Sequence, residues 1–138
     1  MGTAGHTPNF VATESILPFA CVALIGPLRV GKALYQYPIC GICDGSVSAY
    51  DGTNHAVAGG LVSLQNGEFM QGKAGGPINA SGMLVTDSNG FFVESSTVND
   101  QVQFQAAENA NAGEVFWVYR LGAYSILASF VPPAIEEP

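Results

Sequence analysis

The chain has 138 residues, of which 48% are hydrophobic and only 11% are charged, and its formal net charge is −7. This length suits one domain with a substantial core, and the hydrophobic fraction excludes disorder by composition. The basic residues are few and form no cluster, which argues against binding to nucleic acid or to an anionic membrane: Arg29, Lys32, Lys73 and Arg120.

The first nine residues predict an extended arm rather than part of a core. They contain no basic segment and no apolar run, so they do not form a signal peptide. The longest apolar run, Ile16 to Ile25, is interrupted by Pro18 and is far shorter than the ~20 residues of a membrane-spanning helix. We therefore expect a soluble protein that is made in the cytoplasm and not secreted.

Short apolar segments divided by glycine and proline follow the arm. Phe10–Glu14 predicts a first strand, and Phe19–Ile25 predicts a buried strand that Gly26-Pro27 ends. Pro38–Asp44 is a further apolar strand candidate. The spacing of these segments is typical of β structure.

The middle of the chain contains the strongest turn signals. Asn66-Gly67 predicts a hairpin between Leu61–Gln65 and Glu68–Gln71, because Asn-Gly favours the tight turns that join paired strands. The stretch Lys73–Gly90 contains four glycines and a proline around the short apolar run Met83-Leu84-Val85. A helix cannot continue through such a stretch.

The last third of the chain predicts the clearest strands. Gln101–Ala106 alternates apolar and glutamine residues, which is the period-two pattern of a half-buried strand. Glu114–Leu121 and Tyr124–Val131 are rich in β-branched and aromatic residues. Between these segments, Ala107–Gly113 fits a loop or a single helical turn.

Together these segments predict an all-β fold: a compact sandwich or small barrel of short antiparallel strands with an extended N-terminal arm. About nine to eleven strands are expected at spacings near 8–12 residues. The arm covers residues 1–9, the β domain residues 10–131, and a flexible acidic tail residues 132–138.

The cysteines were considered as a metal or redox site. Cys40 and Cys43 form a CxxC pair, which Cys21 and His55 would complete as a zinc site. In a strand, however, residues three apart point to opposite faces, and free cysteines are commonly buried. We expect reduced thiols and no metal or other cofactor.

Catalytic constellations are equally weak, and we expect no enzyme activity. The chain has two histidines, His6 in the arm and His55 after a turn, where we expect a solvated loop residue. No nucleophile elbow is present. Five carboxylates would offer a glycosidase pair, but we expect them on turns and solvated strand faces: Asp87, Glu94, Asp100, Glu108 and Glu114.

Aromatic residues on the predicted strand 114–121 suggest an interaction surface. In an extended strand Phe116 and Val118 face one way, and Trp117 and Tyr119 face the other. One pair belongs to the core, and the other is exposed or covered by a neighbour, as aromatic surface at interfaces often is. We take Phe10, Phe116, Trp117 and Tyr119 as the candidate interface residues.

Two segments resemble a known family. AGGPINASGMLVTDSNG, from Ala74 to Gly90, and VQFQAAENANAGEVFWV, from Val102 to Val118, are similar to small phage head proteins that decorate or cement the capsid. Pro38–Ser46 also looks like a strand of that family. The resemblance implies a β-rich fold, oligomers that are often trimers, and attachment to the major coat protein, and it implies no catalytic residues. The Cys40/Cys43 pair and the proline-rich tail depart from the family pattern.

The sequence thus leads to one hypothesis with two rivals. The first is a capsid decoration or cement protein that binds the outer surface of the assembled phage capsid as a homotrimer and bridges major capsid protein subunits, with the arm as part of the contact. It would be made in the host cytoplasm and reside on the virion. The alternatives are a tail-fibre, receptor-binding or carbohydrate-binding β module, and a small β-fold hydrolase.

Overall fold

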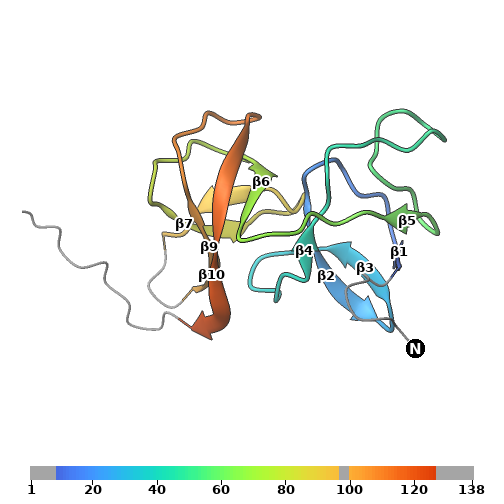
Figure 1. Ribbon diagram of the computed structural model, residues 1–138, viewed down its shortest axis with the longest axis horizontal. Coiled ribbons are helices and arrows are strands. Elements are labelled where there is room, and N and C mark those ends of the chain that lie inside the picture. Colours follow the sequence, from blue (N-terminus) through green and yellow to red (C-terminus); the bar gives the residue numbers. More distant parts are fainter. Residues whose placement is uncertain (1–8, 97–99, 127–138) are drawn as a thin grey trace, which may run out of the picture.

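The computed structural model describes residues 9–96 and 100–126, and for residues 101 and 122–126 it describes the backbone alone. The described residues contain no helix and form two five-stranded sheets, which confirms the all-β prediction (Figure 1). The strands are β1 (Phe10–Ala12), β2 (Cys21–Gly26), β3 (Arg29–Lys32), β4 (Gly41–Ile42), β5 (Leu61–Val62), β6 (Phe69–Lys73), β7 (Met83–Thr86), β8 (Phe92–Glu94), β9 (Gln101–Ala106) and β10 (Val115–Ile126).

The first sheet has the order β4-β2-β3-β1-β5 and curls until its outer strands meet. All its pairings are antiparallel except β1 with β3. Just after β5, Ser63 O accepts the Asp44 N–H at 3.0 Å, and the Gln65 N–H donates to Ile42 O at 2.9 Å. These bonds join the chain after β5 to β4, so the sheet forms a small barrel. Its interior is filled by a cluster of buried apolar side chains that includes Phe10, Ile16, Val22, Val30, Cys43 and Val62.

The second sheet has the order β6-β10-β9-β7-β8 and is antiparallel throughout. Its ends also approach each other, because the Gly75 N–H after β6 donates to Phe92 O in β8 at 2.7 Å. Three phenylalanines, Phe92, Phe104 and Phe116, occupy the concave side, with ring centroids 5.4 and 6.1 Å apart for the two pairs that include Phe92. Aromatic pairs at such distances are attractive beyond the area that they bury.

β2 belongs to the first sheet, but its side chains pack in both cores. Val22 of β2 points into the barrel, whereas Cys21 and Ala23 point into the core of the second sheet. All three residues are at most 2% exposed. The barrel and the second sheet therefore lie side by side, as Figure 1 shows.

The predicted Asn66-Gly67 hairpin is wrong. β5 and β6 belong to different sheets, so this turn carries the chain from the barrel to the second sheet instead of pairing its flanks. The Gln65 side chain replaces a partner strand at this point. Its Oε1 accepts the Gln71 N–H at 2.9 Å, and its Nε2 donates to Gln71 O at 2.7 Å.

The C-terminal part of the fold differs in one further respect. β10 runs without a break from Val115 to Ile126, where two strands separated by Gly122 were predicted. Its pairing with β9 shifts register between Arg120 and Ser125. Residues 127–131 of the predicted β domain, the tail 132–138 and the arm, apart from Asn9, lie outside the described residues.

The close packing of β6 against β8 yields a stability prediction. A Cβ at Gly72 would lie 2.5 Å from two ring carbons of the buried Phe92, whereas a Cβ at Gly76 would meet only Val93 at 3.8 Å. Overpacking a core costs about 1–3 kcal/mol. We expect Gly72→Ala to lower the free energy of unfolding by that amount in urea titration, and Gly76→Ala to change it by less than about 0.5 kcal/mol. Equal effects of the two substitutions would contradict this packing.

Candidate interaction surface

The outer face of β6 and β10 carries exposed aromatic side chains. Phe116 and Val118 point inward and are 1% and 0% exposed, so the alternate residues point outward. Of these, Trp117 is 46% exposed, and Phe69 on β6 is 56% exposed. The alternation predicted for this strand is therefore present, with the Trp117 side outside.

The register between the two strands brings these rings together. Tyr119 lies opposite Phe69, with ring centroids 5.1 Å apart, and Trp117 lies opposite Gln71. Directly opposed residues on one face are in contact distance, and diagonal neighbours are within reach of large side chains. Phe69, Trp117 and Tyr119 thus form one surface, which we call the aromatic face. Phe69 was not among the predicted interface residues, although the period-two pattern of a strand over Glu68–Gln71 puts it on the same face as Gln71.

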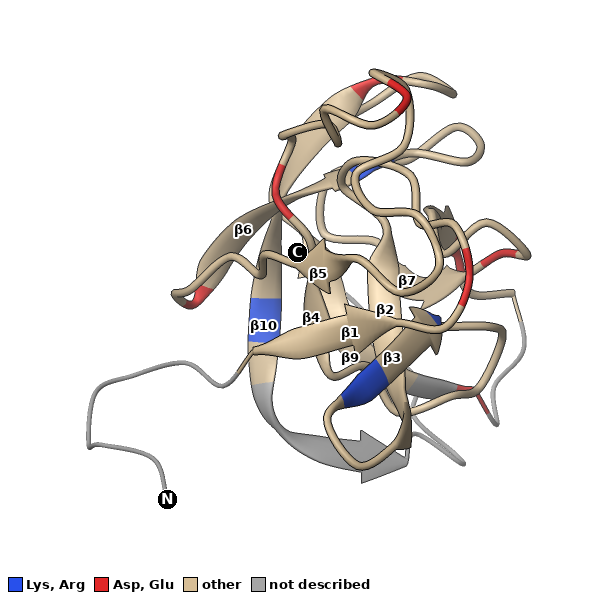
Figure 2. Ribbon diagram, turned by 90° about the vertical axis from the view of Figure 1, so that its right-hand side faces the viewer, with Lys and Arg blue, Asp and Glu red and all other residues tan. Residues whose placement is uncertain are grey.

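Carboxylates surround the aromatic face. Glu68 and Glu114 directly precede Phe69 and Val115, and both are exposed. Glu108 lies beside Trp117, and the backbone N–H of Trp117 donates to Glu108 Oε2 at 2.8 Å. Of the basic residues, Arg29 and Lys32 lie on β3, Lys73 ends β6 opposite Val115, and Arg120 lies on β10 (Figure 2). A partner that docks on the aromatic face therefore meets apolar rings with three carboxylates nearby and Lys73 at one end of β6.

A second exposed apolar surface lies at the tip of the β2–β3 hairpin. Leu24, Ile25 and Leu28 are 57%, 53% and 52% exposed. Leu28 has a φ of 53°, a left-handed conformation that costs energy in a residue with a side chain. The hairpin tip belongs to the barrel, and Figure 1 places it away from β6 and β10.

The other two candidate interface residues lie inside the cores. Phe10 is 8% exposed and packs in the barrel, and Phe116 is 1% exposed and packs against Phe92. Neither ring offers surface to a partner directly. Their assignment as interface residues stays a prediction.

The three thiols are divided between separate environments. Cys21 lies in the core of the second sheet, Cys43 lies in the barrel, and Cys40 is partly buried. Burial raises the pKa of all three, and that of Cys43 to about 12. Within the described residues, no group of three or more His, Cys, Asp or Glu side chains is placed to hold a metal ion.

His55 is not the solvated loop residue that was predicted. It is 5% exposed, because its ring lies between the backbone of Ser46 and that of Ser63. Its Nδ1 lies 2.8 Å from Ser46 O, and its Nε2 accepts the Ser63 N–H at 3.0 Å. Both ring nitrogens are occupied by backbone groups, so His55 holds the loop rather than acting as a base.

The carboxylates considered for catalysis have structural partners. Four of them accept backbone N–H bonds, namely Asp87, Glu94, Glu108 and Glu114. Asp100 is 3% exposed and accepts hydrogen bonds from Tyr35 and Gln36, which tie the loop after the barrel strand β3 to the second sheet.

The described residues include no helix with the length and hydropathy needed to cross a membrane.

Comparison with known proteins gives a likeness in fold. No known family matches the chain, and no curated protein is detectably similar to it in sequence. Among solved structures, the crystal structure of the head fiber gp8.5 N base in bacteriophage phi29 is similar, with a TM-score of 0.64 and 16% identity. The likeness covers 81% of this chain and 90% of that one.

The thiol environments predict a graded reactivity. We expect Cys40 alone to react with a thiol reagent in the native protein at pH 8, and more slowly than a free thiol, because burial raises its pKa and reduces the thiolate fraction. Cys21 and Cys43 should react only on unfolding. The measurement is the stoichiometry of labelling with and without denaturant, with Cys40→Ser as the variant that should abolish native labelling. Labelling of Cys43 at the rate of Cys40 would contradict the barrel closure.

Proposed function

We propose that the chain is a structural protein of the virion of a tailed phage, attached to the outer surface of the head. Two observations support this proposal. The fold resembles the base of a phage head fiber, and the aromatic face presents Phe69, Trp117 and Tyr119 on a charge-poor domain. The aromatic face carries the proposal, since exposed aromatic surface of this kind marks sites of protein association.

The proposed task is to cement the shell by bridging subunits of the major capsid protein. A bridge requires two separate contact surfaces, because contact with one subunit does not oppose its separation from the next. The aromatic face and the hairpin tip lie on different sheets, so they are suited to contact two neighbouring subunits. Apolar surface at both places is consistent with protein partners on each side.

The physical effect would be thermodynamic rather than catalytic. A protein that binds the assembled shell better than its separate subunits stabilises the shell by mass action. A specific junction of this kind buries about 1,000 Å² or more. In this proposal the chain has no catalytic residues and needs no cofactor.

A binding module of a tail fibre is the second candidate. The exposed Trp117 favours it, because Trp and Tyr rings also serve as platforms for sugars and peptides. The two candidates differ in where the chain resides and in what the aromatic face contacts. Binding to purified heads that lack the protein separates them.

The aromatic face should dominate binding to heads. We expect Trp117→Ser and Phe69→Ser each to weaken binding of the purified protein to such heads at least tenfold, because central aromatic residues typically contribute 2 kcal/mol or more to an interface. Co-sedimentation with heads over a range of protein concentrations measures the affinity. The heads should also burst at a lower temperature when the variants replace the native chain.

Tyr50→Ser is the matched control, since Tyr50 is 84% exposed and lies outside both apolar surfaces. It should bind as the native protein does. If the hairpin tip contacts a second subunit, Leu24→Ser should lower both the affinity for heads and the temperature at which the heads burst. If Trp117→Ser binds heads as tightly as the native protein does, the aromatic face is not the contact surface. If the native protein does not bind heads, the proposed attachment to the capsid is wrong.

We further propose that the chain forms a homotrimer. Its sparse charge, and an apolar outer face on β10 that includes Val115 at 40% exposed, favour association. Sedimentation velocity at micromolar concentration should give a species of three times the 14.3 kDa chain mass. A monomer at all concentrations would confine association to the capsid, where the local concentration is high.

A further inference from the structure

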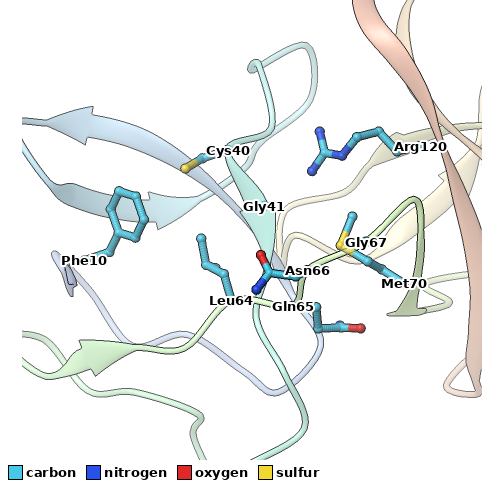
Figure 3. A pocket seen from close by; sticks show the side chains of 9 residues that line it. All are labelled: Phe10, Cys40, Gly41, Leu64, Gln65, Asn66, Gly67, Met70 and Arg120. Carbon is cyan, nitrogen blue, oxygen red and sulfur yellow. The ribbon is translucent and has the colours of Figure 1, made fainter. Parts of the chain in front are cut away.

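A pocket at the junction of the barrel and the second sheet has no role in the surfaces described above. Its volume is about 280 Å³. The walls come from β1, from the start of β4, from the crossing segment 64–67, from β6 and from β10: Phe10, Cys40, Gly41, Leu64, Gln65, Asn66, Gly67, Met70 and Arg120. Figure 3 shows these residues around a common space.

Arg120 is the only charged residue of this pocket, and its position is fixed by its neighbours. Its guanidinium carbon lies 4.9 Å from the ring centroid of the buried Phe104, and its backbone N–H donates to Glu68 O at 2.8 Å. Stacking uses the face of the guanidinium and leaves the N–H donors in its plane available. In Figure 3 the guanidinium extends from β10 toward Cys40 and Gly41.

This guanidinium has no anionic partner among the described residues. Among the carboxylates of the described chain, Glu14 forms an ion pair with Lys32 at 3.8 Å, and Asp44 lies 3.5 Å from His55 Nδ1. None of the hydrogen bonds between described residues involves the Arg120 side chain. Arg29 and Lys73 also form no such ion pair with a described residue, and Arg120 differs from them in that it lines the pocket. Arg120 is half-buried, so an anion bound in the pocket would offset part of the cost of removing its charge from water.

The remaining polar groups define what the pocket accepts. The Gln65 carboxamide is occupied, since it bonds Gln71 through both of its atoms and also donates to Cys43 O at 3.2 Å. The Asn66 carboxamide at the pocket rim makes no such bond to a described residue, and it adds donors beside Arg120. Phe10, Leu64 and Met70 supply apolar walls.

From this arrangement we propose that the pocket between β4, β6 and β10 binds a carboxylate carried on a short aliphatic stem, with Arg120 as the ion-pairing residue and Asn66 as a secondary donor. Planar guanidinium and carboxylate groups match in a two-bond geometry. The volume lies just below the roughly 300–1,000 Å³ of pockets for drug-sized ligands, so it suits an acid of side-chain size. Such a carboxylate comes either from a free small acid or from a Glu side chain of a docked protein.

The test is a titration of the isotope-labelled full chain, followed by nuclear magnetic resonance, with sodium butyrate as the probe. Butyrate should produce saturable shifts of the Gly41 and Gly67 amide signals and of the Arg120 side-chain N–H. Butyramide has the same shape without the charge, and it should bind at least about tenfold more weakly, a difference of 1.4 kcal/mol. Equal shifts with the two compounds would overturn the proposal without any substitution in the protein.

Substitutions then assign the interaction. Arg120→Gln should abolish saturation by butyrate, and Arg120→Lys should weaken it, because lysine keeps the charge but lacks the planar fork. Arg29→Gln, at an exposed position on β3, is the matched control and should bind as the native chain does. A melting curve of each variant checks that the fold is retained. Retained binding by a folded Arg120→Gln variant would also overturn the proposal.

A capped Gly-Glu-Gly peptide distinguishes the two sources. Binding of the peptide as tight as that of butyrate identifies a protein side chain as the ligand, and binding of butyrate alone identifies a free small acid. Saturation by neither compound would show that the pocket has no affinity for carboxylates. These outcomes are independent of the proposed attachment to heads, because they are measured on the purified chain.

Discussion

The fold depends on the first half of β2, Cys21 to Ala23, which is buried on both of its faces. Val22 fills the barrel, while Cys21 and Ala23 fill the core of the second sheet. A strand in this position cannot alternate apolar with polar residues, and the continuous apolar run from Phe19 to Ile25 meets that requirement. A polar substitution at any of these three positions would disturb one core directly. It would also affect the other core, because side chains of the same strand pack in both.

The glycine-rich stretch 73–90 ends in a turn that contacts β2. Gly90 adopts a φ of 82°, and a Cβ there would lie 2.7 Å from Cys21 O. Its carbonyl accepts the Cys21 N–H at 2.8 Å. The turn that ends the stretch therefore approaches β2 closely enough that only glycine fits, and it ties the second sheet to the barrel through the backbone.

The aromatic face, the hairpin tip and the Arg120 pocket all follow from the division of the domain into the barrel and the second sheet. The barrel and the second sheet each bury their own core. The aromatic face lies on the second sheet, and the hairpin tip lies on the barrel. The pocket forms where the halves meet, because the crossing segment 64–67 spans the gap between β4 and β6. A protein with one sheet would offer neither two distant contact surfaces nor a pocket between them.

The sequence by itself determined the features that depend on local patterning. The alternation of Gln101–Ala106 and the alternate placement of Phe116 and Trp117 are both found in the structure, since a strand with one buried face imposes a period of two. The all-β class followed from glycine and proline, which exclude helices wherever they interrupt a segment.

Only the tertiary structure decided which segments pair and what lies between them. Asn66-Gly67 predicted a hairpin because its turn chemistry is local, yet the partners of β5 and β6 are set by core packing and by the Gln65 side chain, which occupies the edge at Gln71. His55 is buried for a similar reason: its two backbone partners come from residues 46 and 63, which meet only when the barrel closes. The pocket at Arg120 joins residues from Phe10 to Arg120, and sequence patterning carries no information on contacts of such separation.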